Sequence, residues 1–179
     1  PGDGDVAGGK TSRTAEAIYE IWRASRAVKG TQLVFVDFSA PASGAFSVPT
    51  DLRNKLVKLG IPKTEIAFIQ DAKNVKAQEQ LFQNVRRGRI RVLIGSTEKM
   101  GIGVNVQNKV VALHHLDAPW RPADLEQREG RALRPGNENA EVDVLLYLTP
   151  GSFDAYMWQT LERKARFIDQ IMRGDVGVR

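Results

Sequence analysis

A pair of arginines close to a glutamine has the clearest chemistry in this sequence. The stretch QREGRALR, residues 127–134, contains Gln127, Arg131 and Arg134. Residues three apart are neighbours on a helical surface, so we expect both arginines on one face of a short helix. Guanidinium groups bind phosphate oxygens through two parallel hydrogen bonds and stay charged at any working pH. The spacing therefore predicts a helix that senses a phosphate group.

A glycine-rich stretch upstream is the second candidate. Residues 95–107, GSTEKMGIGVNVQ, follow an apolar run that is typical of a strand. Ligands gather at the carboxyl ends of strands in open α/β sheets, and Gly101 and Gly103 allow a close backbone approach. Ser96 and Thr97 can donate hydrogen bonds to phosphate oxygens. Alone, the stretch would be an ordinary strand–helix turn; beside the two arginines it indicates a loop that contacts nucleotide and nucleic acid.

Two kinds of hydrophobic pattern alternate along the chain, and they predict the strands and helices that hold these residues in place. Short apolar runs with the character of buried strands alternate with segments of helical period. This alternation predicts βαβ units, and hence one α/β domain with a parallel sheet. The expected strands are residues 33–38, 66–69, 91–95, 110–114 and 142–148, and the expected helices are residues 14–28, 51–59, 76–85, 122–131 and 153–172.

The order and spacing of these motifs resemble the second RecA-like lobe of superfamily 2 helicases and translocases, most of all the Swi/Snf-type branch. The first family motif is matched by Ser96, Thr97, Gly101, Gly103 and Asn105, and the second by Gln127, Arg131 and Arg134. Residues 115–122, HLDAPWRP, are similar to the family's Asp-x-x-Trp-Asn-Pro segment, with Arg121 in place of Asn. The likeness covers residues 9–172 and extends to large helicase–methyltransferase-like proteins of bacteria and phages. Met100 and Leu133 depart from the pattern, where a glycine and a histidine are usual.

The resemblance implies half of a two-lobe motor built on a single RecA-like domain with helices on both faces of its sheet. It implies two partners: an N-terminal RecA-like lobe of the same parent protein, and duplex DNA, bound through its phosphate backbone. ATP and Mg²⁺ would be bound mainly by that first lobe, so we expect this chain alone to hydrolyse little or no ATP. The implied roles are catalytic arginine fingers for Arg131 and Arg134; nucleotide contacts for Gln127, Gly101, Gly103 and Asn105; and nucleic-acid contacts for Ser96, Thr97, Phe38, Ser39 and Lys73.

The expected organisation has three parts. Residues 1–10 are expected to be a flexible segment, residues 11–150 the lobe, and residues 151–179 an amphipathic helix packed on the lobe. The stripe that should pack consists of Met157, Leu161, Lys164, Ile168 and Ile171.

Two other functions compete with this interpretation. Residues 4–11, GDVAGGKT, match the G-x-x-x-x-G-K-T pattern of a phosphate-binding P-loop. An autonomous P-loop NTPase would use Lys10 and Thr11, but no strand is expected before this glycine-rich turn, and the P-loop mechanism needs one. A non-catalytic RecA-like module that binds nucleic acid is the other alternative.

Several residues receive a structural interpretation instead. Arg128 is expected to face solvent. His114 and His115 are adjacent in a strand and point to opposite faces, so they are expected to pack at the strand end and not to share a metal ion. The basic run at residues 86–91, RRGRIR, is expected to be a solvated turn between a helix and a strand, and a contribution to DNA binding by its charge is the less favoured alternative.

Composition sets wider limits. The 179 residues include no cysteine, which excludes disulfides and thiolate metal sites. The net charge of +5 favours polyanionic partners. No apolar run approaches the ~20 residues that span a bilayer, so we expect no membrane partner and a cytoplasmic location.

Overall fold

Five short apolar segments form a parallel sheet in the computed structural model, which describes residues 9–37, 47–101, 104–119, 121–130 and 134–172. The strands are β1 (Thr31–Phe35), β2 (Ile66–Phe68), β3 (Val92–Gly95), β4 (Val110–His115) and β5 (Asp143–Leu146). Their order across the sheet is β2-β3-β1-β4-β5, and every neighbouring pair is parallel. Consecutive strands are joined through helical crossovers, which parallel pairing requires. The predicted RecA-like α/β fold is confirmed.

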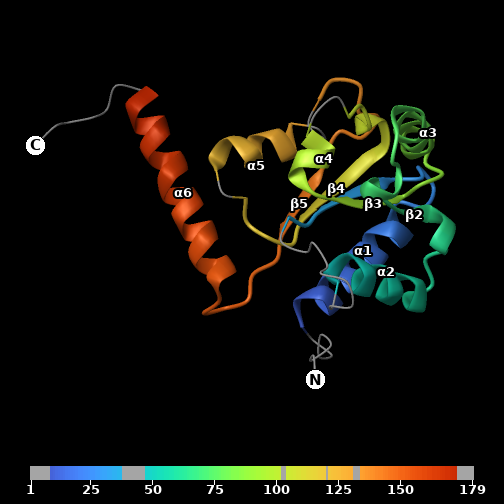
Figure 1. Ribbon diagram of the computed structural model, residues 1–179, viewed down its shortest axis with the longest axis horizontal. Coiled ribbons are helices and arrows are strands. Elements are labelled where there is room, and N and C mark those ends of the chain that lie inside the picture. The colour runs from blue at the N-terminus through green and yellow to red at the C-terminus, as the bar shows by residue number, and fades with distance from the viewer. Residues whose placement is uncertain (1–8, 38–46, 102–103, 120, 131–133, 173–179) are drawn as a thin grey trace, which may run out of the picture.

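Helices cover both faces of this sheet (Figure 1). Side chains alternate along β1: Val34 and Val36 pack toward one face, and Leu33 and Phe35 toward the other. The first face is covered by α1 (Lys10–Ala24) and α2 (Val48–Leu59), and the second by α3 (Val75–Arg86) and α4 (Thr97–Gly101). Three short 3₁₀ turns complete the connections: η1 (Lys63–Glu65), η2 (Ile69–Asp71) and η3 (Gln107–Lys109).

The last two helices, α5 (Pro122–Glu129) and α6 (Phe153–Met172), meet beside the end of β4. Their shared apolar cluster contains Ala118, Leu125, Met157, Trp158 and Leu161. Beyond this cluster α6 extends away from the sheet (Figure 1), and its side chains from Glu162 onward are exposed where they are described.

The packing expected for α6 is therefore found only in its first half. Met157 and Leu161 of the predicted stripe are buried, but Ile168 is half exposed, and the Ile171 side chain lies outside the described residues. None of the helices among the described residues is long and apolar enough to cross a membrane.

The helix boundaries differ from the expected ones by a few residues. Lys10, assigned to a flexible segment, already begins α1; residues 1–8 of that segment lie outside the described residues. Gly60 ends α2 as expected, in a left-handed conformation with φ 117°. More important for function, α5 ends at Glu129 and not at Arg131.

Candidate functional site

The carboxyl edge of the sheet brings together three polar residues, each of which is the second residue after a strand. Asp37 follows β1, Thr97 follows β3 and Asp117 follows β4. These strands are neighbours in the order β3-β1-β4, so their carboxyl ends meet at one place. Gly95, at the end of β3, allows Ile69 of η2 to pack closely against it: a Cβ atom there would lie 2.4 Å from Cγ2 of Ile69.

Arg128 of α5 joins the three strand ends. Its side chain is completely buried, and its guanidinium lies 5.2 Å from the centre of the Phe35 ring. All five of its N–H donors are engaged. Nε donates to Oγ1 of Thr97 at 2.6 Å; Nη1 faces the Asp117 carbonyl at 2.9 Å and Nδ1 of His115 at 3.2 Å; Nη2 donates to Oδ2 of Asp37 at 2.5 Å and Oδ1 of Asp117 at 3.0 Å.

The expectation that Arg128 faces solvent is therefore wrong. Leu125 and Arg128 are three residues apart, so they share the face of α5 that packs on the core. The sequence contains this signal, and it also contains the aspartates that follow two apolar strands. The buried charge is tolerated because carboxylates and oxygen acceptors surround it, whereas an isolated buried charge would be very costly.

The two carboxylates in this cluster differ in their electrostatics. Burial raises the pKa of Asp37, but hydrogen bonds from Thr97 and the charge of Arg128 outweigh it and leave that pKa below its usual value. Asp117 is more deeply buried, and burial raises its pKa above the usual value although Arg128 opposes this. The Asp37 backbone N–H also donates to Asp117. Asp37 is thus the firmly ionised partner of Arg128.

The two histidines of β4 are buried and neutral. Because the Gln32 amide nitrogen donates to the Ile18 carbonyl, its oxygen must accept from Nε2 of His114 at 2.7 Å. Nδ1 of His114 then accepts from the Tyr147 hydroxyl at 2.7 Å. His115 Nδ1 faces an Arg128 donor, so its proton is on Nε2. Burial lowers the pKa of both rings to about 3. Repulsion from His115 adds to this effect at His114, and the charge of Arg128 adds to it at His115.

This arrangement confirms the prediction that the histidines pack at the strand end. His114 contacts Gln32 and Tyr147, whereas His115 stacks on Phe35 and meets the edge of Trp158. Among the described residues, no group of three or more His, Cys, Asp or Glu side chains is placed to hold a metal ion.

Residues from both sequence motifs line one polar hollow of about 400 Å³ beside this cluster. Ser96, Thr97 and Gln127 lie in its wall together with Asp37, Glu98, Arg121 and Asp124. The hydroxyl of Thr97 is already bound between Asp37 and Arg128, so it is not free to donate to a ligand. Ser96 is half-buried, and its hydroxyl accepts from the Lys99 backbone N–H at 3.3 Å. The structure thus brings together part of the predicted site.

Other predicted site residues lie elsewhere. Arg134 is exposed and lies beyond the end of α5, so the expected helix carrying both arginines is not observed. Asn105 is exposed, and its carbonyl accepts from Arg86 of α3 at 2.8 Å. Lys73 is exposed in the turn before α3, and Gly101 ends α4. Four predicted residues lie outside the described residues: Phe38, Ser39, Gly103 and Arg131.

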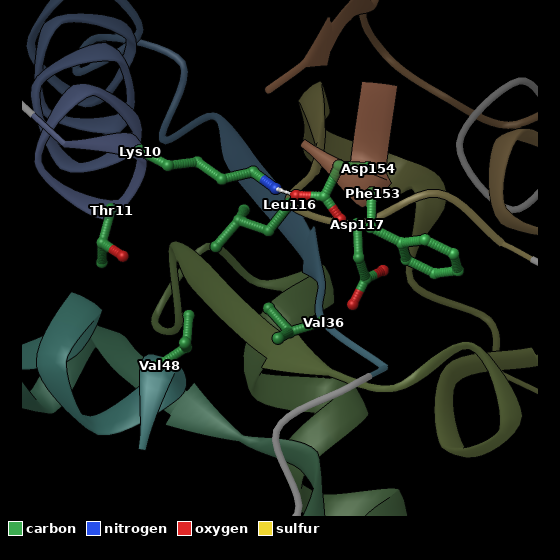
Figure 2. Close-up of a pocket in the computed structure, with 8 residues that line it drawn as sticks. All are labelled: Lys10, Thr11, Val36, Val48, Leu116, Asp117, Phe153 and Asp154. Carbon is green, nitrogen blue, oxygen red and sulfur yellow. Dashed lines mark hydrogen bonds and ion pairs between the residues drawn. The ribbon is translucent and has the colours of Figure 1, made fainter. Parts of the chain in front are cut away.

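A second hollow, of about 440 Å³, lies at the same edge near the start of α1 (Figure 2). Val36, Val48 and Leu116 contribute apolar side chains to its wall, and Asp117 belongs both to this wall and to the Arg128 cluster. Lys10 forms an ion pair with Asp154 of α6 across its mouth. The P-loop-like lysine thus begins a helix and joins two segments that are 144 residues apart.

Comparison with known proteins is consistent with this geometry. The helicase conserved C-terminal domain family matches residues 13–136. Defense against restriction protein B of Escherichia phage P1 is 37% identical over 106 residues, which are 59% of this chain and 5% of that protein. The uncharacterized ATP-dependent helicase YqhH of Bacillus subtilis (strain 168) is 30% identical over 99 residues, 54% of this chain and 17% of that protein.

Among solved structures, the C-terminal part of the Fun30 ATPase domain is similar, with a TM-score of 0.63 and 20% identity. The match covers 82% of this chain and 44% of that structure. At this level of identity the likeness supports the fold. The chain spans only a small part of the curated relatives, 5% and 17% of their lengths.

Proposed function

Because this chain belongs to the helicase conserved C-terminal domain family, we propose that it is the C-terminal motor lobe of an ATP-dependent superfamily 2 DNA helicase or translocase of the Swi/Snf-like branch. One observation supports this most directly. Ser96 and Gln127, from two separate motifs, line the same hollow at the carboxyl edge of a parallel sheet. Open α/β sheets bind their ligands at this edge.

In this proposal ATP binds between this lobe and an N-terminal RecA-like lobe of the same parent protein. Arg131 and Arg134 approach the γ-phosphate and stabilise the charge that develops during its transfer. Gln127, with the loop that contains Gly101, Gly103 and Asn105, contacts the nucleotide. ATP supplies the phosphoanhydride bond whose hydrolysis drives movement. Mg²⁺ is assigned to the first lobe, as the resemblance to two-lobe motors implies.

Arg128 is proposed to position the arginines. It ties α5 to the ends of β1, β3 and β4, so α5 cannot rotate without breaking several charged hydrogen bonds. The end of α5, at Glu129, is therefore held relative to Thr97 and the neighbouring Ser96. This connection gives a physical route by which contacts at the strand ends and at the nucleotide influence each other.

Nucleic-acid contacts are proposed for the strand-end loops, through Phe38, Ser39, Lys73, Ser96 and Thr97. The Thr97 hydroxyl is bound internally, so its contribution would be to hold Ser96 in place. Contacts to phosphates carry little sequence information and weaken as salt increases. The proposed substrate is accordingly duplex DNA bound through its backbone.

The test is ATP turnover by this chain and by its parent protein, each with and without duplex DNA. We expect no turnover by the chain alone and DNA-stimulated turnover by the parent. Arg131→Ala in the parent should reduce turnover by roughly 10³-fold or more, the range seen when arginine fingers are removed. Arg163→Ala, at an exposed position of α6, is the matched control and should leave turnover unchanged.

Two outcomes would overturn the proposal. Turnover by the chain alone that disappears in Lys10→Ala would assign the function to the P-loop-like segment. Parent turnover that survives Arg131→Ala unchanged would identify a nucleic-acid-binding module without a catalytic role.

A further inference from the structure

Three turns meet at the amino edge of the sheet, opposite the site described above. They are residues 25–30, 60–65 and 87–91, which precede the neighbouring strands β1, β2 and β3. The first and third turns touch closely: a Cβ atom on Gly88 would lie 2.7 Å from Cβ of Lys29. The second joins them through the Arg91 backbone N–H, which donates to the Glu65 carbonyl at 2.8 Å.

These turns surround a hollow of about 750 Å³ that is rich in positive charge. Its lining contains four cations and one carboxylate, together with the ring of Trp22. The charged side chains are Arg26, Lys29, Glu65, Arg89 and Arg91. The net charge of the wall is thus about three positive units.

Two of the charged groups have structural partners. Arg91 is 4% exposed; its Nε donates to the Gly30 carbonyl at 2.9 Å, and its Nη2 to the Trp22 carbonyl at 2.8 Å and to Ser25 Oγ at 3.0 Å. Its guanidinium also lies 5.2 Å from the centre of the Trp22 ring. Glu65 accepts from the Trp22 indole N–H at 2.7 Å. Both groups therefore build the wall.

The remaining three cations are exposed around the hollow. Arg26, Lys29 and Arg89 form no ion pair with any side chain in the described part of the protein. Nearby helix ends reduce this charge but do not remove it. The carboxyl termini of α1, α2 and α3 point to this edge, and each carries about half a negative charge. A positive surplus remains beside an aromatic ring.

We propose that this hollow is a second phosphate-binding site. It binds the sugar–phosphate backbone of a nucleic-acid strand at the amino edge of the sheet, opposite the polar hollow at the carboxyl edge. Its volume suits a ligand of small-molecule size and far exceeds a single phosphate ion. Among the described residues, the three cations without ion-pair partners lie on two separate turns of its wall, which favours a ligand with more than one phosphate. The site does not depend on the roles proposed above for Arg131 and Arg134.

The test measures binding of a fluorescently labelled 20-nucleotide single strand to the 179-residue chain by anisotropy, over a series of salt concentrations. The double variant Arg26→Ala/Arg89→Ala removes two cations from the hollow. If each contacts a phosphate, the slope of log K against log salt falls by about 1.4, and binding at 0.1 M salt weakens by about 25-fold. Arg163→Ala/Lys164→Ala removes two exposed cations from α6 and should change neither value.

A single variant tests the proposal even if the double variant does not fold. Lys29 has φ 52°, a left-handed conformation that suits glycine, so Lys29→Gly removes the charge without adding backbone strain. We expect it to lower the salt slope by about 0.7 while the melting temperature is kept. Inorganic phosphate is the competitor: displacement of the strand only at high millimolar concentrations supports a backbone site.

The proposal is overturned if the hollow and α6 double variants weaken binding equally, because that would indicate diffuse charge. It is also overturned if Lys29→Gly and the hollow double variant bind the strand as tightly as the unmodified 179-residue chain does. Complete displacement of the strand by low millimolar phosphate would overturn it too, because that would indicate a site for the free ion. ATP turnover is not measured in this experiment. Failure of the motor proposal and failure of this one are therefore distinguishable.

Discussion

Two buried arginines stand at opposite edges of the same sheet, and they are held in different ways. Arg128, at the carboxyl edge, is surrounded by the carboxylates of Asp37 and Asp117. Arg91, at the amino edge, is bound by two backbone carbonyls, a serine hydroxyl and the face of Trp22. Burial lowers the pKa of Arg91; Glu65 opposes this, and nearby Arg26 adds to it.

The two edges therefore suit different roles. The carboxylates neutralise Arg128 locally and hold α5 against three strands, so this arginine organises the protein and offers little positive charge to a ligand. The carbonyls around Arg91 are neutral, so they accept its hydrogen bonds without cancelling its charge. The amino edge therefore keeps a positive surplus that favours anions, whereas the site proposed at the carboxyl edge would take its positive charge from Arg131, Arg134 or a partner lobe.

The largest expected effect comes from Arg128→Ala. It leaves Asp37 and Asp117 without their cation, and loss of one member of a buried ion pair costs about 3–5 kcal/mol. Urea unfolding followed by circular dichroism would measure this change. Arg134→Ala, at an exposed position, is the control and should stay within about 0.5 kcal/mol. A loss below about 1 kcal/mol for Arg128→Ala would show that the cluster does not organise this edge.

The second-largest expected effect is a loss of stability at low pH, which arises at the carboxyl edge. Both histidines of the sequence lie there, with pKa values of about 3 when folded against 6.5 when unfolded. The unfolded chain binds more protons between these values, so stability falls as pH is lowered through this window. The expected loss between pH 7 and 5 is about 2 kcal/mol for each histidine.

The measurement is the free energy of unfolding at pH 7, 6 and 5. His115→Gln should remove about half of the pH dependence between these values. The raised pKa of Asp117 acts in the opposite direction, because the folded state then holds its proton more tightly as pH falls. A flat profile from pH 7 to 5 would contradict buried neutral histidines.

Arg91→Met should cost less than Arg128→Ala. The substitution leaves the carbonyls of Gly30 and Trp22 without their donor, but no buried carboxylate loses its partner. We therefore expect the free energy of unfolding to fall by about 1–3 kcal/mol. The methionine also keeps part of the contact with the Trp22 ring. Parallel urea titrations of the two variants test the contrast directly. Equal losses of stability in the two variants would mean that the carboxylates around Arg128 do not make it more important for stability than Arg91.

The smallest effect is expected for Arg121→Ala. Arg121 pairs with Asp124 at 3.0 Å, but its side chain is 76% exposed. Surface ion pairs of this kind contribute about 0–1 kcal/mol and are screened by salt. We expect a change in melting temperature of no more than about 4 °C, and a larger shift would assign Arg121 a structural role in the polar hollow.

Much of the fold was predictable because apolar periodicity is a local property. All five strands and the principal helices fall close to their expected positions, and Pro122 and Gly60 mark helix boundaries as expected. The site was predictable only in part. Ser96, Thr97 and Gln127 were identified from motif spacing, but the interpretation of Arg128 required knowing which face of α5 meets the sheet.

The sequence alone was enough to predict the alternation of strands and helices, the order of the motifs and the family to which the chain belongs. The burial of Arg128, the internal binding of the Thr97 hydroxyl and the meeting of three basic turns at one hollow became clear only in the folded structure. These features depend on the order of the strands in the sheet. β1 lies between β3 and β4 in space but is distant from both in sequence, so the carboxylates that neutralise Arg128 come from positions 91 and 11 residues away.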